Sequence, residues 1–189
     1  MDGMISISDI SKIKKPIVWT FHDMWPFCGA EHIAWDKRWK EGYRYDNRPI
    51  HESGFDLNRW TWERKRKYWK HPFKIVTPSN WMAKCVQQSS LMSGWPVNVV
   101  PNCLDTNIWR PIKKSLARDL HSLPKDVPLI MFGSNGINSA HHKGYDLLIG
   151  ALNKLSGKIK DMELVIFGEI APKVPPNFRF PVRYVGHLH

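Results

Sequence analysis

The sequence has few cysteines, no long apolar run and a shortage of acidic residues. Its three cysteines, Cys28, Cys85 and Cys103, form no Cys-x-x-Cys pair and leave an odd one, so neither a zinc site nor a disulfide framework is predicted. No run of about 18 apolar residues is present to span a membrane. Residues 1–16 also lack the apolar core of a signal peptide. These absences favour a reducing cytoplasm.

Basic residues outnumber acidic ones. The chain has 28 Lys and Arg against 17 Asp and Glu, a formal net charge of +11. Such a charge fits phosphate-bearing small molecules, an anionic membrane or nucleic acid. Ten tryptophans, concentrated between Trp19 and Trp109, are unusually many. With 189 residues, the chain can form one large α/β domain or two small ones.

Short apolar segments alternate with amphipathic helices, which predicts parallel sheets. Strands are expected at 16–21 (of the buried type), 73–77, 97–100, 129–132, 164–167 and 182–185. Helices are expected at 1–13 (weak), 59–74, 80–90 after a Ser79 cap, 116–121 after a Ser115 cap, and 144–155. Pro101 ends the third strand, and Asn102 and Asp105 supply turn chemistry. Residues 102–111 are therefore predicted to connect two α/β halves.

The first candidate site follows the first strand. His22 and Asp23 stand at its carboxyl end, where open α/β sheets bind ligands. They could be a general base or a substrate-orienting pair, or a capping aspartate beside a hydrogen-bonded histidine. Residues 28–58 show no periodicity, and a loop of this length is more often functional than idle.

The second candidate site follows the fourth strand. Gly133, Ser134, Asn135 and Gly136 form a glycine-bearing loop before Lys143 and Gly144, which open a helix. A helix N-terminus presents free N–H groups and a positive dipole end, and Lys143 adds a positive charge, so a phosphate site is predicted. The alternative is a plain connection with a surface lysine. The pattern is neither a Walker A loop nor a GxGxxG fingerprint.

Residues Arg59–Lys74 interleave tryptophans with basic side chains. This segment could lie on a membrane surface, bind nucleic acid, or be a packed helix with a basic solvent face. The histidines, including His141 and His142, fit no usual metal-ligand spacing, so no metal site is predicted.

Together these segments resemble family-four glycosyltransferases of the GT-B fold, most of all the bacterial branch that builds colanic acid, capsule and O-antigen. Four ordered segments carry the resemblance: residues 16–27 (PIVWTFHDMWPF), 75–82 (IVTPSNWM), 99–106 (VVPNCLDT), and Phe132–Gly133 with 142–145 (HKGY). The resemblance covers nearly the whole chain.

The resemblance implies two Rossmann-like lobes with parallel sheets, both incomplete here. Residues 1–110 would be the later part of the N-terminal, acceptor-side domain, and residues 111–189 the first part of the C-terminal, donor-side domain. His22 would face the reacting sugar, and Lys143 would neutralise donor phosphate. The remaining donor-binding residues expected are Gly133, Ser134, Asn135, His142, Gly144 and Asn102.

The implied activity is transfer of a sugar from a UDP- or GDP-linked donor to a glycan or lipid-linked acceptor. It would be retaining and need neither metal nor cofactor, because protein cations take the charge of the leaving diphosphate. The enzyme would be cytoplasmic and peripheral at the inner membrane face, touching anionic lipid through Arg59–Lys74, without nucleic acid.

Three departures from the family pattern stand out. No arginine lies between Gly133 and Lys143, Cys103 replaces a usual glycine, and both the opening glycine-rich loop and the Glu-x7-Glu segment are absent. The chain is therefore expected to be a middle section, inactive alone. The alternative function is a non-enzymatic, basic and tryptophan-rich module that binds nucleic acid or anionic membrane.

Overall fold

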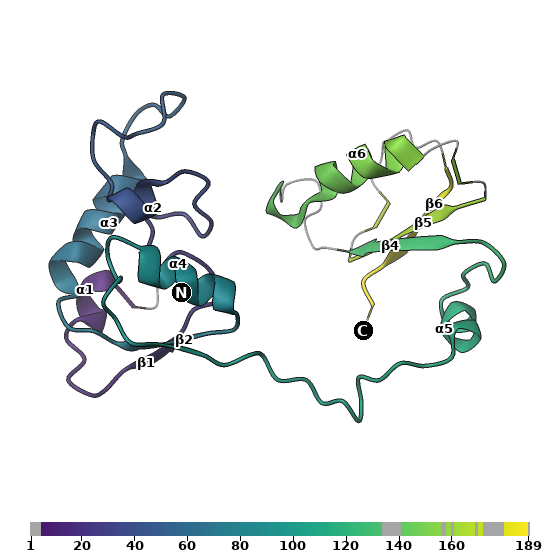
Figure 1. Cartoon of the computed structure of the whole chain (residues 1–189), viewed down its shortest axis with the longest axis horizontal. Coiled ribbons are helices and arrows are strands. Elements are labelled where there is room, and N and C mark those ends of the chain that lie inside the picture. The colour runs from purple at the N-terminus through teal and green to yellow at the C-terminus, as the bar shows by residue number, and fades with distance from the viewer. Residues whose placement is uncertain are drawn as a thin grey trace. The chain divides into compact units, whose positions relative to one another are not determined.

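The computed structural model describes residues 5–133, 141–155, 158–159, 161–168, 170–171 and 180–188. The chain divides into two compact units, Met1–Asp105 and Thr106–His189, and each contains a three-stranded parallel sheet (Figure 1). The predicted fold class, α/β with two Rossmann-like parallel units, is confirmed. Assigning the units as acceptor-side and donor-side domains stays a prediction.

The sheet of the first unit has the order β1-β2-β3, formed by β1 (Val18–Thr20), β2 (Lys74–Thr77) and β3 (Val97–Val99). Trp19 pairs with Ile75, and Ile75 pairs with Val97. The expectation of a buried first strand is wrong, because β1 lies at the edge of the described sheet. Val18 is 65% exposed there, and within β1 only Trp19 packs against the core, although Ile17 and Phe21 on either side of the strand do so as well.

Four helices accompany this sheet: α1 (Ile7–Ile10), α2 (Arg38–Glu41), α3 (Leu57–Tyr68) and α4 (Asn80–Gln88). The predicted cap of α4 is confirmed, since Ser79 Oγ accepts from the Met82 N–H at 3.2 Å. The third helix ends at Tyr68, well before the predicted Lys74. Pro72 disfavours helical dihedrals at His71, and the Trp69 indole donates to the Ile7 carbonyl at 2.9 Å instead.

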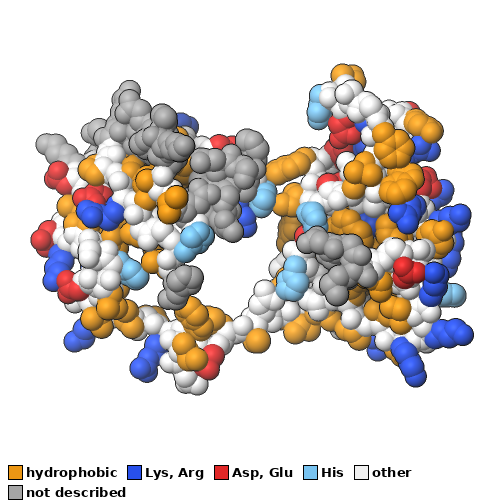
Figure 2. All heavy atoms as spheres, turned by 180° about the vertical axis from the view of Figure 1, so that it is seen from behind, with side chains coloured by type: hydrophobic (Ala, Val, Ile, Leu, Met, Phe, Trp, Pro, Cys, Tyr) orange, Lys and Arg blue, Asp and Glu red, His pale blue; other side chains and the backbone are white. Residues whose placement is uncertain are grey.

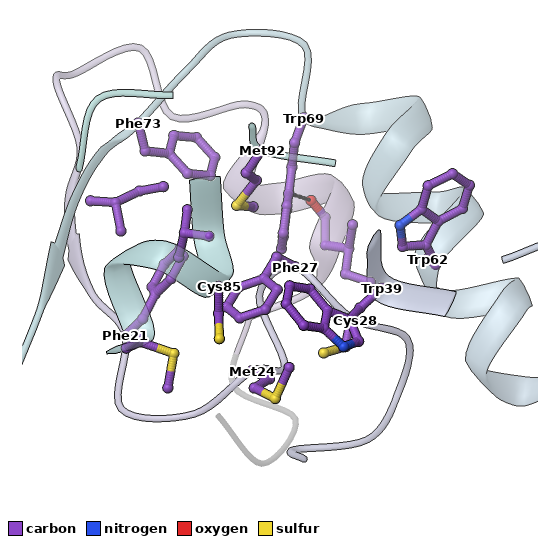
Figure 3. Packing of buried hydrophobic residues seen from close by; sticks show 14 of the residues in the cluster. Phe21, Met24, Phe27, Cys28, Trp39, Trp62, Trp69, Phe73, Cys85 and Met92 are labelled. Atoms are coloured by element: carbon purple, nitrogen blue, oxygen red, sulfur yellow. Dashed lines mark hydrogen bonds between the residues drawn. The ribbon is translucent and has the colours of Figure 1, made fainter. Parts of the chain in front are cut away.

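The core of the first unit is built largely from aromatic rings (Figure 3). Trp69 meets Trp19 and Phe73 edge-on at centroid distances of 5.6 and 5.8 Å. Edge-to-face pairs of this kind are favourable beyond their area burial. This packing explains why many of the tryptophans lie in this half of the chain.

The aperiodic segment 28–58 is held by buried charge. Arg38 is 1% exposed and donates to Asp56 at 2.5 Å. The Cζ atom of its guanidinium lies over the Tyr43 ring, 4.6 Å from the ring centroid. Burial raises the pKa of Asp56, but hydrogen bonds from Arg38 and Arg59 outweigh it and leave that pKa lowered. This buried pair links two distant points of the segment, and removing either partner would leave an uncompensated charge.

The second unit contains α5 (Lys114–Leu120), β4 (Leu129–Gly133), a 3₁₀ turn η1 (His141–Lys143), α6 (Tyr145–Leu155), β5 (Glu163–Phe167) and β6 (Val182–Gly186). The sheet order is β4-β5-β6, all parallel. Ser115 is not the predicted cap, because α5 begins one residue before it with Lys113 in the cap position. Leu152 of α6 is buried against Leu164 and Ile166.

Candidate functional site

A cavity of about 270 Å³ lies at the carboxyl end of β1. Its lining residues are Trp19, Thr20, Phe21, His22, Asp23, Trp25, Pro26 and His32. The backbone N–H of Phe21 still donates to Val76 of β2 at 2.8 Å, and the chain leaves the sheet directly afterwards. His22 is therefore the first residue past the sheet, and its side chain is exposed.

The carboxylate of Asp23 contacts two other residues that line this cavity, Trp25 and His32. One carboxylate oxygen accepts from the Trp25 N–H at 2.9 Å, and the other lies 2.6 Å from Nδ1 of His32. The Met24 N–H donates to the His32 carbonyl at 2.9 Å, which fixes the same pair through the backbone. Asp23 is thus both a turn cap and the partner of a histidine, but that histidine is His32 and not His22.

Aromatic rings form the apolar wall of the cavity. Trp19 and Trp25 have ring centroids 6.4 Å apart and an interplanar angle of 51°. Ligand pockets combine such apolar faces with a few placed polar groups that fix orientation. Here the polar groups are the imidazoles of His22 and His32 and the carboxylate of Asp23.

Behind the cavity, α3 contributes a fully buried lysine. Lys65 Nζ donates to the carbonyls of Trp25, Cys28 (3.1 Å) and Gly29 (2.7 Å). Burial lowers the pKa of Lys65 to about 7, although Cys28, Glu31 and Asp23 act in the opposite direction. Burial also raises the pKa of the Cys28 thiol, so this cysteine stays protonated.

The predicted phosphate site is described only in part. Ser134 and Asn135 lie outside the described residues, while His142 and Lys143 are exposed in η1. The helix begins at Tyr145 rather than at Gly144, whose φ of +72° and carbonyl bond to the Leu148 N–H make it the cap. Lys143 therefore precedes the helix cap by one residue.

Packing within the sheet explains why residue 133 is a glycine. It ends β4 opposite Phe167 of β5, and a Cβ at this position would overlap the Phe167 ring. Asn102 is exposed in the connecting segment. Within the described ranges, no group of His, Cys, Asp and Glu side chains could hold a metal ion, and no helix is long and apolar enough to cross a membrane.

The model of Glycosyltransferase Family 4 matches residues 4–108, which is more than half of the chain. The chain belongs to glycosyltransferase family 4. The match includes the cavity at the end of β1 and Asn102, and it ends before the second sheet. The chain has no match among curated proteins or among solved structures.

For this family-four chain, membership decides between the two functions that the sequence left open, and it favours a glycosyltransferase over a non-enzymatic module. The sequence identified His22 and Asp23 but missed His32 as the partner of Asp23. It also grouped Lys65 with the surface bases of Arg59–Lys74. A signal for its burial was present, because Trp62, Lys65 and Trp69 are spaced to share one helix face.

Proposed function

We propose that residues 1–110 belong to the acceptor-side domain and residues 111–189 to the donor-side domain of a bacterial glycosyltransferase that builds surface polysaccharide. It transfers a sugar from a UDP- or GDP-linked donor to a glycan or lipid-linked acceptor, with retention and without a metal. The observation that carries the proposal is the His22 cavity beyond the carboxyl end of β1 in a family-four chain. Ligands of open α/β sheets bind at this edge.

In this proposal, the cavity receives the reacting groups. Transfer breaks the bond from the anomeric carbon to donor phosphate and forms one to an acceptor oxygen, while the acceptor proton leaves with the nucleoside diphosphate. His22 hydrogen-bonds the sugar being transferred. Its imidazole is available for this contact, because it is exposed, lines the cavity and makes no hydrogen bond within the described part of the chain. Such groups act by stabilising charge that develops in the transition state.

The donor diphosphate is proposed to bind near Lys143. Its exposed ammonium and the first N–H groups of α6, behind Gly144, suit an anion. Gly133, Ser134, Asn135, His142 and Asn102 complete the proposed donor site. No metal is required in this scheme, since these cationic and N–H groups meet the leaving charge.

The exposed side of α3 is proposed to contact an anionic membrane at the cytoplasmic face. Phe55 and Trp60 are 72% and 46% exposed, and their rings meet edge to face with centroids 6.2 Å apart. Arg64 lies 4.6 Å from the Trp60 ring centroid, and Lys67 follows on the same face. Figure 2 shows Lys and Arg side chains in blue along this unit. Aromatic rings beside cations suit a lipid interface.

The test uses the full chain as its gene encodes it. UDP- and GDP-sugars are first screened for transfer and for thermal stabilisation of the protein. His22→Ala is then expected to lower kcat about 100-fold with little change in donor affinity. His71→Ala, an exposed histidine before β2, is the control and is expected to behave as wild type. The absence of both transfer and donor-induced stabilisation would overturn the proposal.

A further inference from the structure

Lys65 carries its amino group to a place that water cannot reach, and below its pKa of about 7 this group is a buried cation. Its side chain is fully buried, and its ammonium lies 3.9 Å from the centroid of the Trp25 ring. Among the described residues it forms no salt bridge. Its hydrogen-bond acceptors are three backbone carbonyls, all from the segment of residues 25–29.

A buried charge of this kind is a poor device for stability alone. Removing an ammonium from water is expensive, and an apolar side chain of similar volume is often at least as stable. Packing of the core alone therefore does not explain a lysine at position 65. Three N–H donors on one compact ammonium can draw together three carbonyls that no helix or sheet ladder would bring to one point.

Trp25 links this lysine to the candidate site. Its carbonyl accepts from Lys65, its ring packs against the ammonium, and its N–H donates to Asp23 at 2.9 Å. Asp23 in turn holds His32 at 2.6 Å. A continuous set of hydrogen bonds thus runs from Lys65 through Trp25 and Asp23 to His32, which lines the same cavity as His22.

The turn after Trp25 is closed from the other side as well. The N–H groups of Phe27 and Cys28 both donate to the Met24 carbonyl, at 3.1 and 3.0 Å. Their own turn leaves the carbonyls of Cys28 and Gly29 to Lys65. Without that ammonium these buried acceptors lose their partner, which costs more than the bond itself contributes.

We propose that Lys65 is a positioning residue for sugar transfer, which fixes the main chain at Trp25 and, through it, the Asp23–His32 pair beside His22. The catalytic part of this inference rests on the proposed function. The ammonium itself touches no substrate. It acts by holding the polar wall of the cavity in one geometry, and a displacement of about 1 Å in such a wall can lower a rate by about 100-fold.

The experiment compares Lys65→Met with Lys67→Met, which removes an exposed cation from the same helix. Hydrogen exchange of the folded full chain is measured first. Lys65→Met is expected to speed exchange in residues 22–32 and to leave the second unit unchanged, whereas Lys67→Met changes neither. Unaltered exchange in residues 22–32 overturns the positioning inference, whatever the activity.

Kinetics then separate positioning from general stability. Well below the melting temperature, Lys65→Met is expected to lower kcat roughly 10- to 100-fold with donor KM unchanged. In an Asp23→Asn background the same substitution is expected to add less than about 2-fold, because both changes break one set of contacts. Losses that multiply in the double variant overturn the inference.

Lys65→Gln, which retains two donor hydrogens, is used if Lys65→Met does not fold, and failure of both variants to fold assigns Lys65 to folding and overturns the inference. Loss of the proposed function gives a different result. In that case wild type shows no transfer with any donor, while the exchange measurement still reports whether Lys65 holds the segment.

Discussion

The carboxylate of Asp23 lies 2.6 Å from Nδ1 of His32, nine residues along the chain. This contact fixes the orientation of the His32 ring and leaves Nε2 directed away from Asp23. A histidine that a carboxylate orients in this way is a common arrangement for binding or moving a proton. The pair lies in the cavity at the end of β1, together with His22.

Asp23→Asn is expected to lower kcat at least 10-fold, because an amide holds the His32 ring less strongly than a carboxylate does. Folding should be little affected, since the amide oxygen can still accept from the Trp25 N–H. Steady-state kinetics and melting of the full chain measure both. Asp46→Asn removes another ion-paired carboxylate of the same unit and is the control. Wild-type kcat in both Asp23→Asn and His32→Ala would contradict the prediction.

The stability of the fold should depend on pH through Lys65. Its pKa is about 7 in the folded chain against an ordinary value of 10.5, so between these values the unfolded chain binds more protons. Raising the pH through this window therefore increases the free energy of unfolding. The charged or titratable groups that act on Lys65 are Cys28, Glu31 and Asp23, and the buried Cys28 thiol stays protonated in the window.

The measurement is denaturant unfolding at pH 6 and pH 9 for wild type, Lys65→Met and Lys67→Met. Wild type and Lys67→Met are expected to gain stability relative to Lys65→Met as the pH rises. An equal response of all three proteins would show that Lys65 does not titrate in this range.

Membrane contact is tested by reversing Arg64, Lys67 and Lys70 to glutamate. Lys65 is left unchanged, because its side chain is buried and its reversal would disrupt the fold. Each basic residue near an anionic surface contributes about 1 kcal/mol, so vesicle binding should fall by a factor on the order of 100. Sedimentation with vesicles of anionic and of neutral lipid measures it.

The control for that experiment reverses three exposed lysines elsewhere, Lys84, Lys113 and Lys114, with the same change in net charge. It should bind anionic vesicles more tightly than the first variant. Equal binding by the two variants would mean that overall charge, and not the exposed side of α3, determines the interaction.

The alternation of strands and helices was predictable because each element carries its own period of hydrophobic residues. The Ser79 cap and the amphipathic character of α4 depend on residues close together in the sequence, and both predictions are confirmed. The partner of Asp23 was not predictable, because residues 24–32 have no period and only the closed turn brings His32 back. The grouping of Lys65 with the exposed basic residues was wrong for a related reason. Its neighbours in sequence are basic residues at the surface, but it lies on the same helix face as the buried Trp62 and Trp69.

Gly133 illustrates how a pattern can have two causes. The sequence placed Gly133 in a glycine-bearing loop of the predicted phosphate site, but its position opposite Phe167 already leaves no room for a side chain. Gly133→Ala is therefore uninformative about donor binding, because the Phe167 ring must move to admit a methyl group. Lys143, which is exposed, is the residue that tests the donor site without disturbing the core.

Lys143→Ala is expected to weaken nucleotide-sugar binding roughly 10- to 100-fold, the equivalent of one charge-assisted hydrogen bond of about 1.5–3 kcal/mol. The rate should fall further, because negative charge grows on the leaving phosphate in the transition state. Stability should stay the same or rise slightly, since a cation beside the helix N-terminus opposes the dipole of α6. Lys143→Arg should restore binding only in part, as a planar guanidinium does not replace a compact ammonium.

Lys154→Ala provides the matched control, because Lys154 is an exposed lysine in the last turn of the same helix. There the charge complements the dipole, so its removal should lower stability slightly and leave donor binding unchanged. Calorimetric titration with the donor and melting of the three variants measure both quantities in the full chain. If Lys143→Ala binds donor as wild type does, or melts markedly earlier, Lys143 has a structural role and the phosphate site lies elsewhere.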